Sequence, residues 1–217
     1  MNLKQATLAA IIALCVILAT KTLATLFPIE FGRHSVARVT ITLTALAGLV
    51  VAYFYYRFYR DYAREDQRAL RRVSLLAAIA AAAMAVLYIK GFLIVNELFV
   101  IGFLERMRFL DSVVPWLAWV IYMEFFIVLR GVVKRTENSR LQRAVRMALI
   151  GSVVMVAERT LMLYSHHQFS AFDRTAGLPE SVYMAAIPFI LFAAGSVIHF
   201  FVEFYRDQRI TNKNPDA

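Results

Sequence analysis

The chain has 217 residues, of which 60% are hydrophobic, and its mean hydropathy is +0.61. This composition excludes an ordinary soluble domain. The net charge of +9 does not point to nucleic acid, because the basic residues gather in the segments between apolar stretches, as membrane topology requires. We therefore expect no nucleic-acid partner.

Six apolar stretches are each long enough to cross a hydrocarbon core of about 30 Å, which takes about 20 helical residues. They lack the alternation of apolar and polar residues that is typical of a membrane β-barrel. The sequence therefore predicts an all-α, polytopic helical bundle, with one transmembrane domain over residues 1–217. The predicted spans are 7–26, 36–56, 73–95, 112–133, 144–164 and 183–204.

The basic residues predict the orientation of these spans. Of the 24 lysines and arginines, 16 fall on one side, mostly in the loops 57–72 and 134–143 and the tail 205–217. The positive-inside rule puts this side, with both termini, in the cytoplasm. We expect a multi-pass protein of the bacterial inner membrane, N-in and C-in, whose basic loops contact anionic lipid headgroups.

The second span ends in tyrosines, phenylalanines and arginines, a mixture typical of the headgroup layer. We expect its helix to continue to about Arg72, which would align its arginines in one basic stripe at spacings of three and four. The stripe is either a solvated helix face or a contact surface for lipid or a partner. Its members are Arg57, Arg60, Arg64, Arg68 and Arg71.

The third span is rich in alanine, and small side chains let helices approach closely in lipid. We expect this helix to be central in the bundle. The segment 96–109 is too polar to span and is predicted to extend the helix or to lie at the outer interface. Asp111 or Ser112 is expected to cap the fourth span. Residues 193–196 should give the last span a second close-packing face.

Charged residues also lie far inside the spans, where each adds roughly 2.5–3.5 kcal/mol at a helix centre. They are Lys90, Glu124, Glu158 and Arg159. They are interpreted as structural ion pairs, as an ion, proton or anion pathway, or as a pocket for a ligand or lipid headgroup. Adjacent residues point about 100° apart on a helix, so Glu158 and Arg159 should not satisfy each other. We predict a pair between Lys90 and Glu158.

His166 and His167 end the fifth span on the outer side, where they could sense pH or bind a metal. Adjacent side chains diverge on a helix, so we expect interfacial histidines and no metal or cofactor. The sequence contains no nucleophile elbow, HExxH, CxxC or phosphate-loop motif. We therefore expect a protein that is not an enzyme.

A pattern of charges on apolar helices runs from about residue 85 to 205. It consists of Ile89-Lys90-Gly91, Tyr122-Met123-Glu124-Phe125-Phe126, Arg130, Arg159 followed by His166 or His167, and Ser181-Val182-Tyr183-Met184-Ala185-Ala186. This pattern resembles the phosphate-starvation-inducible PsiE-like membrane family. The resemblance implies a four-helix core in the inner membrane and no defined activity.

These observations favour a non-enzymatic membrane subunit or scaffold that forms a homo-oligomer or binds a membrane-protein partner. The alternative is a small channel or transporter that uses the four intramembrane charges. A membrane enzyme or haem-binding subunit is the second alternative. Haem would need two histidines at one depth, such as His34 facing His166 or His167.

Overall fold

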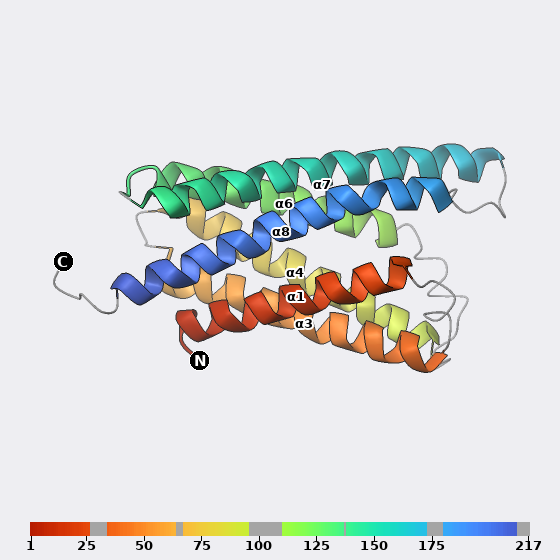
Figure 1. Ribbon diagram of the computed structural model, residues 1–217, viewed down its shortest axis with the longest axis horizontal. Helices are drawn as coiled ribbons and strands as arrows, with labels where there is room; N and C mark the ends of the chain where they lie inside the picture. The colour runs from red at the N-terminus through yellow and green to blue at the C-terminus, as the bar shows by residue number, and fades with distance from the viewer. Residues whose placement is uncertain (27–33, 64–66, 96–109, 137, 173–179, 212–217) are drawn as a thin grey trace.

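The computed structural model describes residues 1–26, 34–63, 67–95, 110–136, 138–172 and 180–211, and these form six long α-helices (Figure 1). Each helix has a stretch long and apolar enough to cross a membrane, so the chain is a multi-pass, all-helical membrane protein. The helices are α1 (Leu3–Leu26), α3 (His34–Asp61), α4 (Arg68–Val95), α6 (Leu110–Val133), α7 (Ser139–Phe172) and α8 (Glu180–Thr211).

The helix boundaries correct one prediction. The helix of the second span does not continue to Arg72, because α3 ends at Asp61 and α4 begins at Arg68. The five arginines of the predicted stripe therefore do not share one helix. Arg64 and the segment 96–109 lie outside the described residues.

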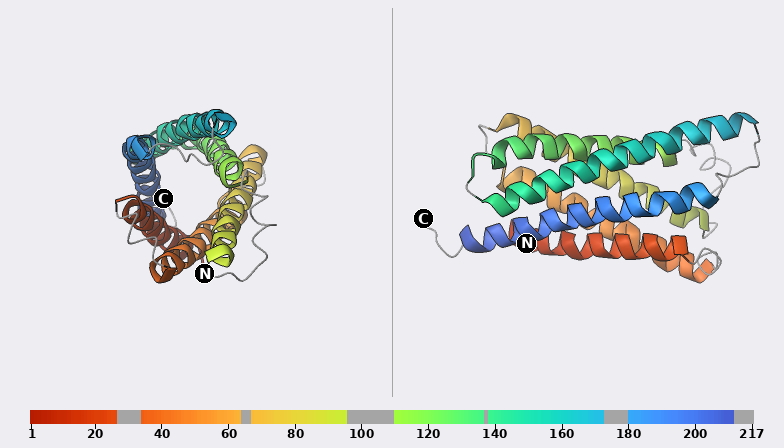
Figure 2. Two further views of the ribbon diagram at one scale, coloured as in Figure 1. Left: turned by 90° about the vertical axis from the view of Figure 1, so that its right-hand side faces the viewer. Right: turned by 45° about the horizontal axis from the view of Figure 1, so that its top comes forward.

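The six helices form a closed ring (Figure 2). Each helix packs against its neighbours in chain order, and α8 closes the ring by packing against α1. We had expected the alanine-rich α4 to be central, and this prediction is wrong. It is one of six wall helices and contacts α3 and α6. A ring has no central helix because all six helices surround one axis.

Small residues set the closest helix contacts, as the sequence predicts. A Cβ atom added to Gly48 of α3 would lie 3.1 Å from the Cβ of Ala85 of α4. Between α7 and α8, Gly151 lies directly against Ala193 and Ser196, which confirms these two residues of the predicted close-packing face, whereas Gly195 is exposed and meets no other helix. Such contacts replace the hydrophobic effect as the force that holds helices together in lipid.

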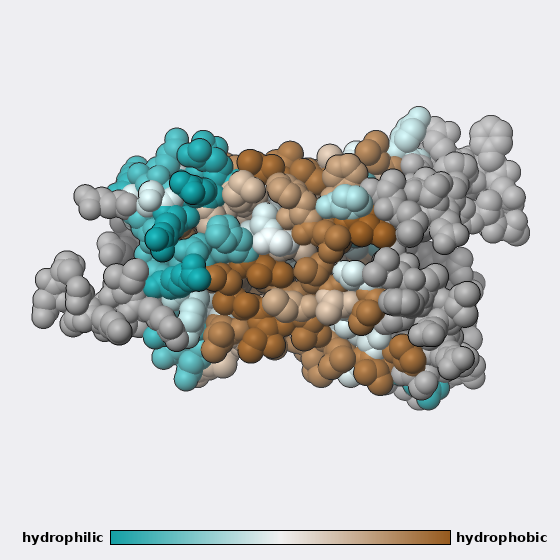
Figure 3. Space-filling view, viewed as in Figure 1, coloured by the Kyte–Doolittle hydropathy of each residue, from teal (hydrophilic) through white to brown (hydrophobic). Residues whose placement is uncertain are grey.

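The face of the ring seen in Figure 3 is apolar across its middle and hydrophilic at one end. We call this the basic end; α1 begins there and α8 ends there. Its exposed arginines include Arg60, Arg68, Arg72, Arg135 and Arg140. A band of exposed leucine, isoleucine and valine side chains beside a basic end is the surface expected of a helical bundle in a bilayer.

Aromatic side chains fill the ring near the basic end. They come from alternate helices, α3, α6 and α8, and all are buried. Phe54 and Phe201 have ring centroids 4.5 Å apart, and those of Phe126 and Phe200 are 5.1 Å apart. Side chains, rather than helix backbones, thus connect helices that are not neighbours in the ring. We call this group the aromatic cluster: Phe54, Tyr55, Phe58, Phe125, Phe126, Phe200, Phe201 and Phe204.

Candidate functional site, an apolar cavity on the ring axis

A cavity lies on the ring axis, beyond the aromatic cluster as seen from the basic end. It has two adjoining parts, of about 130 Å³ and about 200 Å³. Six residues line both parts, so the two parts adjoin, and we call them together the axial cavity. The shared residues are Leu14, Ile17, Met84, Tyr88, Trp119 and Val197.

The walls of the axial cavity explain why space remains there. Where the aromatic cluster fills the axis, the inward residues are phenylalanines. Further along the same helices, the small residues Gly48, Ala118 and Ala194 take their place, and Ala81 of α4 lies beside them in the wall. Apolar cavities of about 150 Å³ stay dry and take up small apolar molecules. The axial cavity therefore suits an apolar group better than a column of water.

Arg159 is the one charged residue among the described residues that line this cavity. It lies on the inward face of α7, with Met155 one helical turn before it, and its side chain is 35% exposed. A guanidinium in an apolar wall is costly without a partner. The outer part of the axial cavity thus combines an apolar body with a single cationic group.

Glu158 lies beside Arg159 and is buried. Arg159 Nε is 3.1 Å from Glu158 Oε2, yet the two atoms are not aligned for a hydrogen bond, and neither has another hydrogen-bond partner within the described structure. We had expected Glu158 and Arg159 not to pair. They indeed form no hydrogen bond with each other, but their opposite charges are in contact. The guanidinium retains donors for a further group.

The predicted pair between Lys90 and Glu158 is replaced by another. Lys90 Nζ lies 2.9 and 2.8 Å from the two carboxylate oxygens of Asp111, which joins α4 to α6. Asp111 is the second residue of α6 and binds the lysine instead of serving as the expected cap. The lysine finds this carboxylate because Asp111 begins a helix that packs against α4.

Glu124 lies away from the cavity. It is exposed on the outer surface of α6, whereas Phe125 and Phe126 point inward. The structure therefore brings together Glu158 and Arg159 but not all four predicted intramembrane charges. One path lined by Lys90, Glu124, Glu158 and Arg159 is not formed by the described side chains.

The arginines of the predicted basic stripe have several partners at the basic end. Arg57 pairs with Asp61, and Arg60 Nε lies 3.2 Å from the same carboxylate. The guanidinium of Arg71 lies 4.9 Å from the ring centroid of Tyr59. Arg68 is exposed and lines a groove that it shares with Arg135. These arginines form a basic surface built from two helices.

His166 and His167 lie within α7, and their side chains lie outside the described part of the structure, as does that of His34. The pH, metal and haem hypotheses for these histidines therefore remain predictions. Among the described residues, no group of three histidine, cysteine, aspartate or glutamate side chains is arranged to hold a metal ion.

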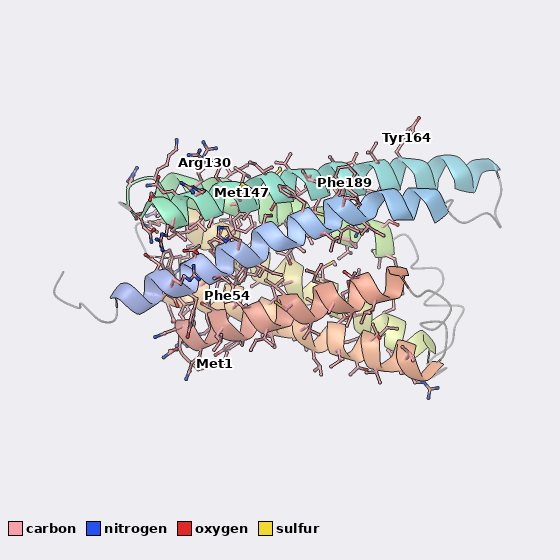
Figure 4. All side chains as sticks on the ribbon, viewed as in Figure 1. Met1, Phe54, Arg130, Met147, Tyr164 and Phe189 are labelled. Atoms are coloured by element: carbon pink, nitrogen blue, oxygen red, sulfur yellow. The ribbon has the colours of Figure 1, made fainter. Side chains whose placement is uncertain are left out.

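Sequence reasoning missed the aromatic cluster. The aromatic run at the end of the second span was interpreted as a headgroup belt. Tyr53 and Tyr56 are exposed, but Phe54, Tyr55 and Phe58 are buried (Phe54 is labelled in Figure 4). Their spacing of one and four residues places them on one helix face, and that signal could have separated them from the belt.

The chain matches no family model, no curated protein and no solved structure. The resemblance to the PsiE-like family therefore stays a prediction, and the function has to be argued from the geometry described above.

Proposed function

We propose that the protein binds a single-chain amphiphile with an anionic head in the axial cavity, without catalysing a reaction. The observation that carries this proposal is the placement of one guanidinium, that of Arg159, in a cavity otherwise lined by apolar and aromatic side chains with Thr22 at its outer part. Ligand sites of this kind are mostly apolar, with a few polar groups that fix orientation.

The chemistry of the lining supports an acyl-like body. Leucine, isoleucine and methionine adapt to a flexible chain, and Tyr88 and Trp119 add flat surfaces along both parts of the cavity. A carboxylate or phosphate head would receive charge-assisted hydrogen bonds from Arg159. The aromatic cluster would limit how far the apolar end can reach toward the basic end.

An ion channel or transporter is less well supported. A conducting path needs water or polar groups along its length. The axial cavity offers apolar walls, and the aromatic cluster occupies the axis beside it. Glu124, which the channel hypothesis requires, points outward.

A membrane subunit that associates with its own copies is a second candidate function. The specific observation that favours it is Glu124 itself, a carboxyl group on the outer surface of a membrane helix. This function is compatible with ligand binding because it uses the outside of the ring. We further propose a bacterial inner membrane with the basic end in the cytoplasm, which the one-sided arginines support.

Tryptophan fluorescence tests the ligand proposal. The sequence has two tryptophans, and Trp116 donates a hydrogen bond to Thr160 on the flank of α7. The variant Trp116→Phe leaves Trp119, in the cavity wall, as the only tryptophan. Titration with cis-parinaric acid, a fluorescent fatty acid, should quench Trp119 in a saturable way.

Two variants separate the head from the body of the ligand. Arg159→Gln should lower the affinity for the acid at least about tenfold, the loss expected for a hydrogen bond to a charged group. It should leave the affinity for the methyl ester of the acid unchanged. Ala194→Phe, which fills the cavity, should lower the affinity for both the acid and its methyl ester. Arg143→Gln, on an exposed turn of the same helix, is the matched control. Equal binding of acid and ester by every variant, or no saturable quenching in the parent, contradicts the proposal.

A further inference from the structure

Glu124 lies near the middle of a membrane helix and has no partner among the described residues. It is nine residues before the end of α6 at Val133, or about 13.5 Å along the helix axis. It is exposed, and within the described residues it makes no ion pair or hydrogen bond. Ala118, Phe125 and Leu129 cover the opposite, inward face of α6. A carboxyl group at this depth is expected to have a functional partner.

A basic residue lies at nearly the same depth on the next helix. Arg146 is seven residues after the start of α7 at Ser139, or about 10.5 Å along its axis. It too is exposed and makes no ion pair or hydrogen bond with another described residue, while Val145 and Ala148 face inward. Because α6 and α7 pack side by side and are joined by the short connection 134–138, the outer surface carries two opposite charges at similar distances, about 13.5 and about 10.5 Å, from the linked ends of these helices.

We propose that this surface is the interface of a homodimer in which Glu124 of each copy pairs with Arg146 of the other. We call it the α6/α7 face and define it by Leu117, Glu124, Ile127, Arg146 and Ile150, all exposed. A two-fold axis along the membrane normal sets α6 of one copy against α7 of the second. Both copies have the same orientation, so every residue keeps its depth.

Charge complementarity favours a second copy over a different partner. Each copy supplies one acid and one base, so a symmetric dimer satisfies all four charges with two ion pairs. A partner helix with a single basic residue would leave Arg146 without a counter-charge. The apolar side chains of Leu117, Ile127 and Ile150 surround the charges and would exclude lipid and water from them. This inference deepens the second candidate function, self-association, and does not depend on a ligand in the axial cavity.

Charge reversal in liposomes tests the pairing. The parent, labelled with a donor or acceptor fluorophore, should show energy transfer that rises with protein density in the bilayer. Glu124→Arg and Arg146→Glu should each raise the dimer dissociation constant at least about tenfold, and the double variant should return to near the parent value. Arg143→Glu, one turn nearer the basic end, should leave it unchanged. Glu124→Gln should weaken the dimer without adding a new charge, and a melting curve for each variant reports whether it folds.

Disulfide cross-linking gives an independent measurement on nearly unaltered protein. In a Cys15→Ala background, Ile127→Cys combined with Ile150→Cys should form covalent dimers in the membrane, whereas Ile79→Cys, equally exposed on α4, should not. A monomeric parent at all densities overturns both the interface and self-association. A parent dimer that is insensitive to both reversals, or that cross-links only through Ile79→Cys, overturns the α6/α7 face and leaves self-association standing.

Discussion

Replacing Gly151 by alanine should push α7 and α8 apart. The new methyl group would overlap Ser196 Oγ and would lie 3.1 Å from Ala193 Cα and 3.3 Å from Ala193 O. The Ser196 hydroxyl can rotate away, at the loss of its 2.8 Å hydrogen bond to Ala193 O. The backbone of α8 cannot rotate away, so the helices must separate by a few tenths of an ångström.

The magnitude follows from a matched comparison. Overpacking a tight contact costs about 1–3 kcal/mol, and replacing glycine by alanine within a helix recovers about 0.5–1 kcal/mol. Gly195→Ala makes the same chemical change on α8, where a new Cβ meets nothing within 4 Å. Helix propensity cancels between the two variants, so their difference in unfolding free energy should be the overpacking cost alone, about 1–3 kcal/mol.

The assay is SDS-driven unfolding of the purified protein in mixed micelles, followed by circular dichroism. Gly151→Ala should unfold at lower SDS than the parent, and Gly195→Ala at the same SDS or higher. Adding Ser196→Ala to Gly151→Ala should recover part of the loss, because it removes the overlapping oxygen. If Gly151→Ala proves as stable as Gly195→Ala, the close approach of α7 and α8 is wrong.

Two further predictions concern the ends of the bundle. Reversing either charge of the pair between Lys90 and Asp111 should lower the SDS midpoint, and the swap Lys90→Asp with Asp111→Lys should restore it; a swap no better than the single variants contradicts the pair. In a Cys15→Ala background, Arg140→Cys should react with a membrane-impermeant maleimide only after the cytoplasmic side is opened, and Ser112→Cys only from the outside. Labelling of residue 140 in intact cells would contradict the proposed orientation and indicate the opposite one.

Hydropathy was sufficient for the number and order of the helices, because a 30 Å hydrocarbon core imposes a span length on any sequence. Small residues likewise predicted that α8 packs closely through Ala193 and Ser196, although they did not identify α7 as the partner. The ring was not predictable in this way. Whether the alanines of α4 meet one neighbour or several depends on which faces the other five helices present, and the sequence of one span does not contain that information.

The charges illustrate the same limit. The energetic cost of a charge in the bilayer singled out Lys90, Glu124, Glu158 and Arg159. It did not predict the direction in which each side chain points. Lys90 met Asp111 because α4 and α6 are neighbours, whereas Glu124 points outward because Phe125 and Phe126 take the inward positions. The axial cavity is lined by residues from all six helices, so no pattern within one segment of the sequence could have predicted it.

The junction of α1 and α8 differs from every other helix pair in this wall. The other five pairs join helices that follow each other in the chain, so each can form as soon as the later helix enters the bilayer. α1 and α8 meet only after α8 has joined the other five helices in the bilayer, and among the described residues no short turn links one directly to the other. Under the ligand proposal, this line of the wall is where a molecule dissolved in the membrane would enter the cavity, because parting it breaks no contact between helices that follow each other in the chain.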